Sequence, residues 1–181
     1  KVLVATSSGP GGGARGLGAL DGSRRGAKRR MEDGLDYGLV GEVVSVDPKP
    51  ITDVIADGFI PVISTVAQGM DAETSYNVNA DTAAAKIAVA LGAEKLILLT
   101  DVRGLLRNQK DESTLISQVR VSDVPALVRD GIVSGGMIPK VECCVEAVRN
   151  GVRRTHILDG RIPHSILIEV LSHAGIGTMI W

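Results

Sequence analysis

Three short polar segments of this chain combine residue types that could bind and transfer an anionic group. They are Asn77–Asp81 (NVNAD), Thr100–Gly104 (TDVRG) and Ser134–Lys140 (SGGMIPK). Free N–H groups at the start of a helix favour an anion, and glycines let the backbone approach a phosphate closely. A lysine behind two glycines can offset charge on a transferring phosphoryl group. Together the segments favour a small anionic substrate and a nucleotide over a protein partner.

Each segment also has a simpler explanation when it is taken alone. Asn77–Asp81 could serve only to cap a helix, Asp101 could cap an ordinary strand-to-helix turn, and Lys140 could be a surface lysine on a helix. The third segment does not follow the P-loop pattern G-x-x-x-x-G-K-[ST], and no G-x-G-x-x-G motif stands between a strand and a helix. The order of the three segments along the chain is therefore more informative than any one of them.

The elements that must position these segments alternate between strands and helices. Runs of Val, Ile and Leu predict strands, and glycines or Asn-Gly pairs after amphipathic segments predict helix ends. The predicted strands are 38–46, 59–67, 95–100, 154–160 and 177–181, and the predicted helices are 51–58, 81–91, 121–130 with Ser122 as N-cap, 139–150 and 164–172. This succession predicts an α/β fold with an open, mainly parallel, doubly wound sheet, helices on both faces, strand 95–100 in its centre and ligands at the carboxyl ends of the strands.

The start of the chain has a different composition. Residues 1–5 could form a short buried strand, whereas residues 6–30 are rich in Gly, Ser and Arg and lack apolar periodicity. By composition we expect a loop or a disordered segment there. The predicted organisation is a divergent segment over residues 1–33, followed by a nucleotide-binding domain over residues 34–181.

Composition excludes several other classes of protein. The net charge of −1 removes any electrostatic case for binding nucleic acid. No apolar run approaches the ~20 residues that a membrane span needs, and no signal peptide is visible. Neighbouring residues of one helix diverge in direction, so we expect Cys143 and Cys144 to be buried thiols in a reducing compartment rather than a bridge or a metal site.

From about Gly38 to Trp181 the chain resembles the acetylglutamate kinases, a group within the amino-acid kinase family. The resemblance rests on GLVGEVVSVDP, GFIPVIS, YNVNADTAAAKIAVALGAEKLILLTDVRGLL, DGIVSGGMIPKVECCVEAV and GIGTMI. It implies phosphoryl transfer from ATP to the side-chain carboxylate of N-acetyl-L-glutamate, the second step of arginine biosynthesis, in the cytoplasm or, in a photosynthetic eukaryote, in the plastid.

The resemblance also implies roles for individual residues. Asn77 would hold the acetylglutamate, Lys140 would be one of two lysines that offset phosphoryl charge, and Asp81 would orient those lysines. Mg²⁺ would be carried mostly by the phosphates, with no dedicated protein metal site. The residues implied for the nucleotide site are Thr100, Asp101, Gly104, Gly136 and Met137.

A further part of the resemblance concerns regulation. Arginine-inhibited members of the family carry a His and a Glu about a dozen residues apart, followed by G-x-G-T, and His156, Glu169, Gly175 and Gly177 match that pattern here. A carboxylate and exposed backbone carbonyls suit a guanidinium and an α-ammonium. The alternative is a core histidine and a solvated helix glutamate. The resemblance also implies a homo-oligomer, provided that the full family interface is present.

This sequence departs from the family pattern before Gly38. No stretch there matches the Lys-x-Gly-Gly loop, the substrate-binding arginine or the hairpin lid, so we expect the second lysine to be lacking and turnover to be impaired. Two other functions stay open: a non-catalytic module that binds a nucleotide or arginine, and a kinase of another carboxylate or carbamate, as in aspartokinase, glutamate 5-kinase and carbamate kinase.

Overall fold

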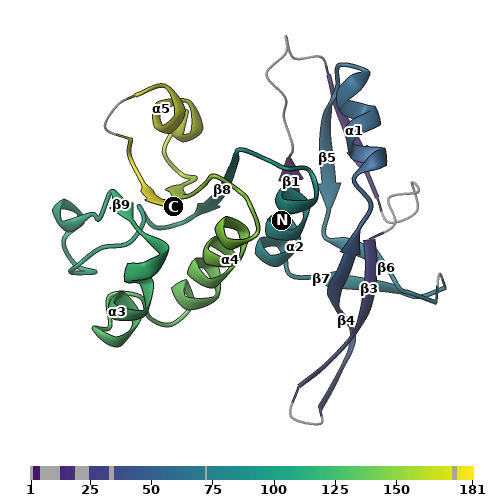
Figure 1. Ribbon diagram of the computed structural model, residues 1–181, viewed down its shortest axis with the longest axis horizontal. Helices are drawn as coiled ribbons and strands as arrows, with labels where there is room; N and C mark the ends of the chain where they lie inside the picture. The colour runs from purple at the N-terminus through teal and green to yellow at the C-terminus, as the bar shows by residue number, and fades with distance from the viewer. Residues whose placement is uncertain (1, 5–12, 19–24, 33–34, 72, 173–174) are drawn as a thin grey trace. The chain divides into compact units, whose positions relative to one another are not determined.

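The computed structural model describes residues 2–4, 13–18, 25–32, 35–71, 73–172 and 175–181. The chain divides into two compact units, Lys1–Leu91 and Gly92–Trp181. Figure 1 labels the helices and strands of each unit.

The first unit contains a sheet in which β5 (Ile60–Ser64) lies between β1 (Val2–Val4) and β2 (Ala14–Leu17). β1 runs antiparallel to β5, and β2 runs parallel to it. Helix α1 (Lys49–Ala56) packs on β5, begins with Pro50 in its first turn and ends before Gly58, whose φ of 80° suits glycine. The apolar core here consists of Leu17, Ile51, Val54, Ile63 and Ile87.

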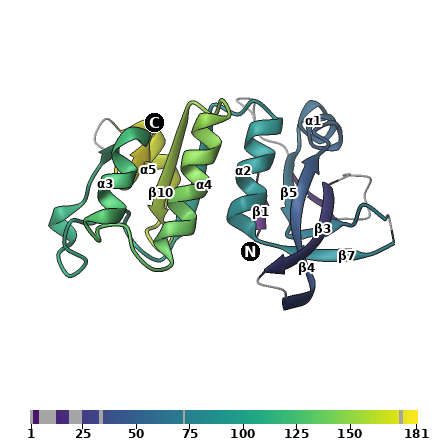
Figure 2. The ribbon, with the colours of Figure 1, turned by 60° about the horizontal axis from the view of Figure 1, so that its bottom comes forward.

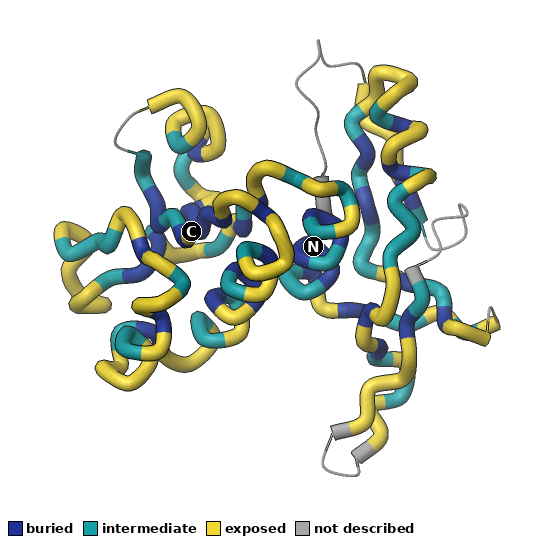
Figure 3. The backbone as a smooth tube through the Cα atoms, viewed as in Figure 1, coloured by how far each residue is buried: buried dark blue, intermediate teal, exposed yellow. Residues whose placement is uncertain are grey.

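A second sheet of this unit has the order β3 (Arg25–Glu32), β4 (Leu35–Val46), β7 (Ser75–Val78) and β6 (Val66–Gln68). Helix α2 (Ala80–Ala90) packs against β4 through small side chains, because its alanines leave room for close approach. Figure 3 shows buried stretches along α2, whereas the β3–β4 hairpin is exposed toward its far end. The core of this sheet consists of Ala27, Val43, Ala67, Val78 and Ala83.

The second unit is built on a sheet with the order β8 (Lys95–Thr100), β10 (Arg154–Asp159), β11 (Thr178–Ile180) and β9 (Gln118–Val119). β8 and β10 are parallel, as are β9 and β11, whereas β10 and β11 are antiparallel. Helix α4 (Met137–Arg149) contacts β8, β10 and β11, and α5 (Ser165–Leu171) contacts β10. Figure 2 shows β10 with α4 and α5 on opposite sides. Helix α3 (Val124–Arg129) follows the 3₁₀ turn η2 (Val121–Asp123), and another 3₁₀ turn, η1 (Glu112–Thr114), lies in the loop after β8.

Most predicted elements are confirmed, and the α/β class with helices on both sides of a sheet is confirmed with them. Helices α1, α2 and α4 end at the predicted glycine or Asn-Gly signals. The sheets are mixed, with parallel and antiparallel neighbours in each. Cys143 and Cys144 are buried thiols that are not bridged to each other, as expected.

Four local predictions were wrong. Residues 14–17 and 25–32 form strands β2 and β3, because pairing with β5 and β4 supplies backbone hydrogen bonds that composition does not reveal. Among the described ladders β8 lies at the edge of its sheet, not in the centre. Ser122 is not an N-cap, because its hydroxyl donates to Asp123 Oδ1 and helix α3 begins only at Val124, with Pro125 in its first turn. The predicted strand 59–67 is divided into β5 and β6.

Other predictions concerning the start of the chain fall outside the described residues. These are the conformation of residues 6–12 and 19–24 and the domain boundary between residues 33 and 34. Among the helices that the structure describes, none combines the length and apolar character needed to cross a bilayer.

Candidate functional site

In the first unit, two asparagines stand at the junction of β7 and α2. Asn79 is the N-cap: its Oδ1 accepts hydrogen bonds from the backbone N–H groups of Asp81 (2.9 Å) and Thr82 (3.2 Å). Asn77 lies within β7, between Val40 of β4 and Val66 of β6, and its side chain is exposed. The capping explanation therefore holds for Asn79, while the Asn77 amide faces solvent and is available to a ligand.

Asp81 occupies the first turn of α2 and is half-buried. A carboxylate there interacts favourably with the positive end of the helix dipole. Its predicted partner, Lys140, belongs to the other unit. Asn77 and Asp81 thus lie at the same strand–helix junction of the first unit, whereas Lys140 lies in helix α4 of the second unit.

In the second unit, the carboxyl ends of β8 and β10 lie side by side. Thr100 is opposite Asp159 in the parallel ladder, and the N–H of Gly160 donates to the Thr100 carbonyl at 2.8 Å. The Thr100 hydroxyl also donates to Asp101 Oδ1 at 3.2 Å. This is the strand edge at which open α/β sheets hold ligands.

The same edge carries an ion pair that the sequence interpretation missed. Asp159 accepts hydrogen bonds from the backbone N–H of Arg161 (2.9 Å) and from its Nε (2.9 Å) and Nη2 (2.8 Å). The Arg161 guanidinium and backbone lower the pKa of Asp159 to about 2, despite a burial contribution that raises it. In the loop that follows β8, Arg103 Nη1 lies 3.4 Å from Glu112 Oε2. The signal available in the sequence was the DGR triplet directly after a strand parallel to β8.

Gly104 is required by packing. Its φ is +149°, and a Cβ there would lie 2.5 Å from Oγ1 of the buried Thr178. That hydroxyl accepts from the N–H of Leu105 at 2.8 Å and donates to the Ile116 carbonyl at 2.7 Å. Thr178 thereby holds both ends of the loop that follows β8, and Gly104 allows the loop to approach it.

The third predicted segment forms the start of α4. Gly136 is the N-cap residue, Met137 is the first helical residue, and Lys140 lies in the first turn, half-buried. A Cβ on Gly136 would meet nothing within 4 Å, so packing does not explain that glycine. Gln109 of the loop after β8 donates to Ser134 Oγ at 3.1 Å, which joins this segment to that loop. The second unit thus brings the predicted nucleotide residues to adjoining loops.

The four residues of the regulatory pattern come together in the second unit. His156 Nδ1 lies 2.8 Å from Glu169 Oε1, with side chains only 7% and 6% exposed. Glu169 Oε2 accepts from the N–H groups of Ile176 (2.7 Å) and Gly177 (3.2 Å). Burial raises the pKa of Glu169, but the hydrogen bonds from Ile176, His156 and Gly177 outweigh it and hold that pKa below its ordinary value. The glutamate is therefore an ionised, enclosed carboxylate, not a solvated one.

Close contacts explain both glycines of this pattern. A Cβ on Gly175 would lie 2.7 Å from Glu169 Oε2, and a Cβ on Gly177 would overlap the Ile157 carbonyl. His156 Nε2 is buried without a hydrogen-bond partner among the described residues. A buried nitrogen of this kind is costly unless a ligand or water satisfies it.

Comparison with known proteins gives matches over nearly the whole chain. The amino acid kinase family model matches residues 2–159. An acetylglutamate kinase of Clostridium beijerinckii is 53% identical over 181 residues, covering 100% of this chain and 63% of the relative. One from Heliobacterium modesticaldum is 52% identical over 189 residues, covering 99% of this chain and 64% of the relative. The chain thus spans less than two thirds of the length of these relatives. The matches also include residues before Gly38, which the motifs noted in the sequence did not cover.

Solved structures agree on the fold. N-acetylglutamate synthase from Neisseria gonorrhoeae, complexed with coenzyme A and L-arginine, superposes with a TM-score of 0.78 at 24% identity, over 97% of this chain and 39% of that one. Carbamate kinase from Giardia lamblia bound to AMP-PNP gives 0.55 at 20% identity, over 86% and 52%.

Proposed function

The chain belongs to the amino acid kinase family, and we propose that it takes part in the transfer of a phosphoryl group from ATP to the side-chain carboxylate of N-acetyl-L-glutamate. The observation that carries this proposal is its identity of 50% or more, over 99–100% of its length, with several acetylglutamate kinases. The step would be the second of arginine biosynthesis, and the cytoplasm is the compartment we expect.

For this reaction the protein needs mainly to position the two substrates and to offset the charge of the phosphoryl group. The substrate carboxylate is already a nucleophile, so no general base is needed, and catalysis rests on alignment and on offsetting phosphoryl charge. Lys140 in the first turn of α4 would supply such charge, and Asp81 would orient it. The exposed amide of Asn77 would hold the acetylglutamate.

The nucleotide would bind in the second unit. Thr100, Asp101 and Gly104 at the end of β8, with Gly136 and Met137 at the start of α4, would form its site. Mg²⁺ would arrive on the ATP phosphates and neutralise their charge, and the exposed Asp101 carboxylate is an oxygen donor of the kind it prefers.

The test is a coupled ADP-release assay on the purified 181-residue chain, run alongside calorimetry with ATP–Mg²⁺. We expect nucleotide binding, with slow turnover that depends on N-acetylglutamate. Lys140→Ala should lower the turnover about 10²–10³-fold with little change in nucleotide affinity, whereas Lys110→Ala, in an exposed loop, should have no effect. Turnover that is faster with aspartate, glutamate or carbamate would refute the substrate assignment. Nucleotide binding without any turnover would favour a non-catalytic module.

We also propose that L-arginine is an effector, bound at His156, Glu169, Gly175 and Gly177. His156 Nε2, which has no hydrogen-bond partner in the part of the chain that the structure describes, could accept a guanidinium N–H, and the guanidinium could compete for the carboxylate of Glu169. Calorimetry with arginine should show binding that Glu169→Gln abolishes; equal affinity in the two proteins would exclude this site. An effector of this type suits a homo-oligomer, which sedimentation would reveal.

A further inference from the structure

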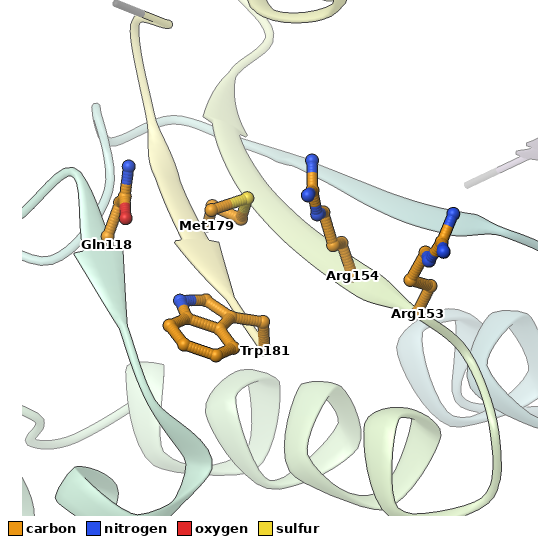
Figure 4. A pocket seen from close by; sticks show the side chains of 5 residues that line it. All are labelled: Gln118, Arg153, Arg154, Met179 and Trp181. Atoms are coloured by element: carbon orange, nitrogen blue, oxygen red, sulfur yellow. The ribbon is translucent and has the colours of Figure 1, made fainter.

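A cavity of about 400 Å³ opens on the second unit, and none of its lining residues belongs to the proposed nucleotide or arginine site. Gln118 of β9, Arg153 and Arg154 at the start of β10, Met179 of β11 and Trp181 line it. Figure 4 shows the two arginine side chains on one side of Met179 and Gln118 on the other, with the indole of Trp181 below. Cavities of this size commonly hold small ligands.

The cavity lies at the opposite end of the strands from the candidate nucleotide site. Arg154 pairs with Lys95 at the start of the β8–β10 ladder, and Asp159 pairs with Thr100 at its end. Five residues of extended strand separate these pairs by about 16 Å. A ligand in the cavity would therefore not overlap the proposed phosphate contacts.

The charge of the cavity is one-sided. The side chains of its lining include two guanidinium groups and an amide but no acidic side chain. Within the part of the chain that the structure describes, neither Arg153 nor Arg154 forms an ion pair, and the residue opposite Arg154 in β8 is another cation, Lys95. Guanidinium groups bind carboxylates and phosphates through paired hydrogen bonds, so this surface is suited to an anion.

The floor of the cavity is apolar and flat. Met179 is half-buried, and Trp181 keeps 45% of its surface exposed. The Arg120 guanidinium lies 5.3 Å from the centre of the indole ring, which braces the ring by a cation–π contact. An exposed indole beside a thioether is a surface on which a planar or apolar group can lie.

We propose that this cavity is a binding site for a small organic anion. Arg153 and Arg154 would bind its phosphate or carboxylate group, Gln118 would donate a further hydrogen bond, and its apolar part would lie on Met179 and Trp181. The site is independent of the proposed kinase reaction and of the proposed arginine site.

Trp181 is the single tryptophan of the chain, so its fluorescence reports directly on the cavity. The full chain is titrated with inorganic phosphate, phenyl phosphate, benzoate and uncharged benzyl alcohol. We expect saturable changes with phenyl phosphate or benzoate, about tenfold weaker binding of inorganic phosphate, and no saturation with benzyl alcohol. The phenyl phosphate and benzoate arms distinguish a phosphate ligand from a carboxylate ligand.

Variants locate the binding. Arg153→Gln/Arg154→Gln should weaken it at least about tenfold, whereas Arg129→Gln/Lys110→Gln, which removes the same charge from exposed positions of the same unit, should leave it unchanged. Excess ADP should not displace phenyl phosphate, and Glu169→Gln should still bind it. The proposal is overturned if no anion saturates, if the double arginine variant binds as wild type, or if ADP displaces phenyl phosphate.

Discussion

At the scale of single residues, the two asparagines of the NVNAD segment have different environments. Asn79 accepts two backbone hydrogen bonds at the start of α2, and Asn77 sits one residue before Val78 in β7 with its amide exposed. The sequence suggested Asn79 as the residue that satisfies the helix start, which the structure confirms, and Asn77 as a contact to a ligand, which stays a prediction.

Replacing each asparagine by alanine should affect a different property of the protein. Asn79→Ala should lower the free energy of unfolding by about 1 kcal/mol, because two N–H groups of α2 lose their acceptor. Asn77→Ala should leave the stability near wild type and raise the KM for N-acetylglutamate. Urea unfolding and steady-state kinetics measure the two effects, and a destabilised Asn77→Ala would indicate a structural role instead.

Asp159 should make stability depend on acid pH. Its folded pKa of about 2 lies below the ordinary 3.8, so its contribution is complete above pH 3.8 and is lost as the pH falls through 2. The Tm difference between wild type and Asp159→Asn should therefore shrink over this interval. Asp130→Asn, whose carboxylate forms only an exposed pair with Arg129, should follow the wild-type profile. A constant Tm difference for Asp159→Asn would show that its effect is not electrostatic.

At the scale of elements, local signals predicted those segments whose ends are encoded in neighbouring residues. Gly58, Gly92 and Gly151 have φ values of 80°, 60° and 105° at the ends of α1, α2 and α4, where the sequence placed stops. Strands β2 and β3 were missed because their Gly- and Arg-rich sequences carry no period. They are strands because β2 pairs with β5, which is distant in sequence, and β3 pairs with β4, which follows it in a hairpin.

The two site glycines Gly104 and Gly136 should respond differently to alanine. Gly104→Ala should cost about 2–4 kcal/mol, because it combines an unfavourable φ with a clash against Thr178. Gly136→Ala should be near neutral for stability, since its φ is −65° and the space around it is open. Thermal unfolding of the two variants measures the loss of stability. A similar loss for both variants would contradict the packing role of Gly104.

At the scale of the whole molecule, the chain consists of two compact units that carry different parts of the proposed chemistry. The first unit holds Asn77 and Asp81, and the second holds Thr100, Asp101, Gly136 and Lys140. The second unit also contains the His156–Glu169 pair and the anion cavity. Ligands should therefore affect the units selectively.

Hydrogen exchange should reveal this division. ADP–Mg²⁺ should slow amide exchange mainly in residues 100–105 and 134–140, and N-acetylglutamate should slow it mainly in residues 75–82. Mass spectrometry of the free and liganded chain measures both. Protection of residues 75–82 by ADP alone would contradict the assignment of the nucleotide to the second unit.

The sequence by itself determined the α/β class, most helix ends and the family, because periodicity, glycine stops and the spacing of NVNAD, TDVRG and GGMIPK are local properties of the chain. Tertiary structure alone decided that Asp159 lies opposite Thr100 at one strand edge, that Glu169 is enclosed by His156 and two backbone N–H groups, and that Arg154 and Trp181 border one cavity. These contacts join residues on different elements, and they depend on the register of the strands and on how the helices pack. Neither the register nor the packing is encoded in a local sequence pattern.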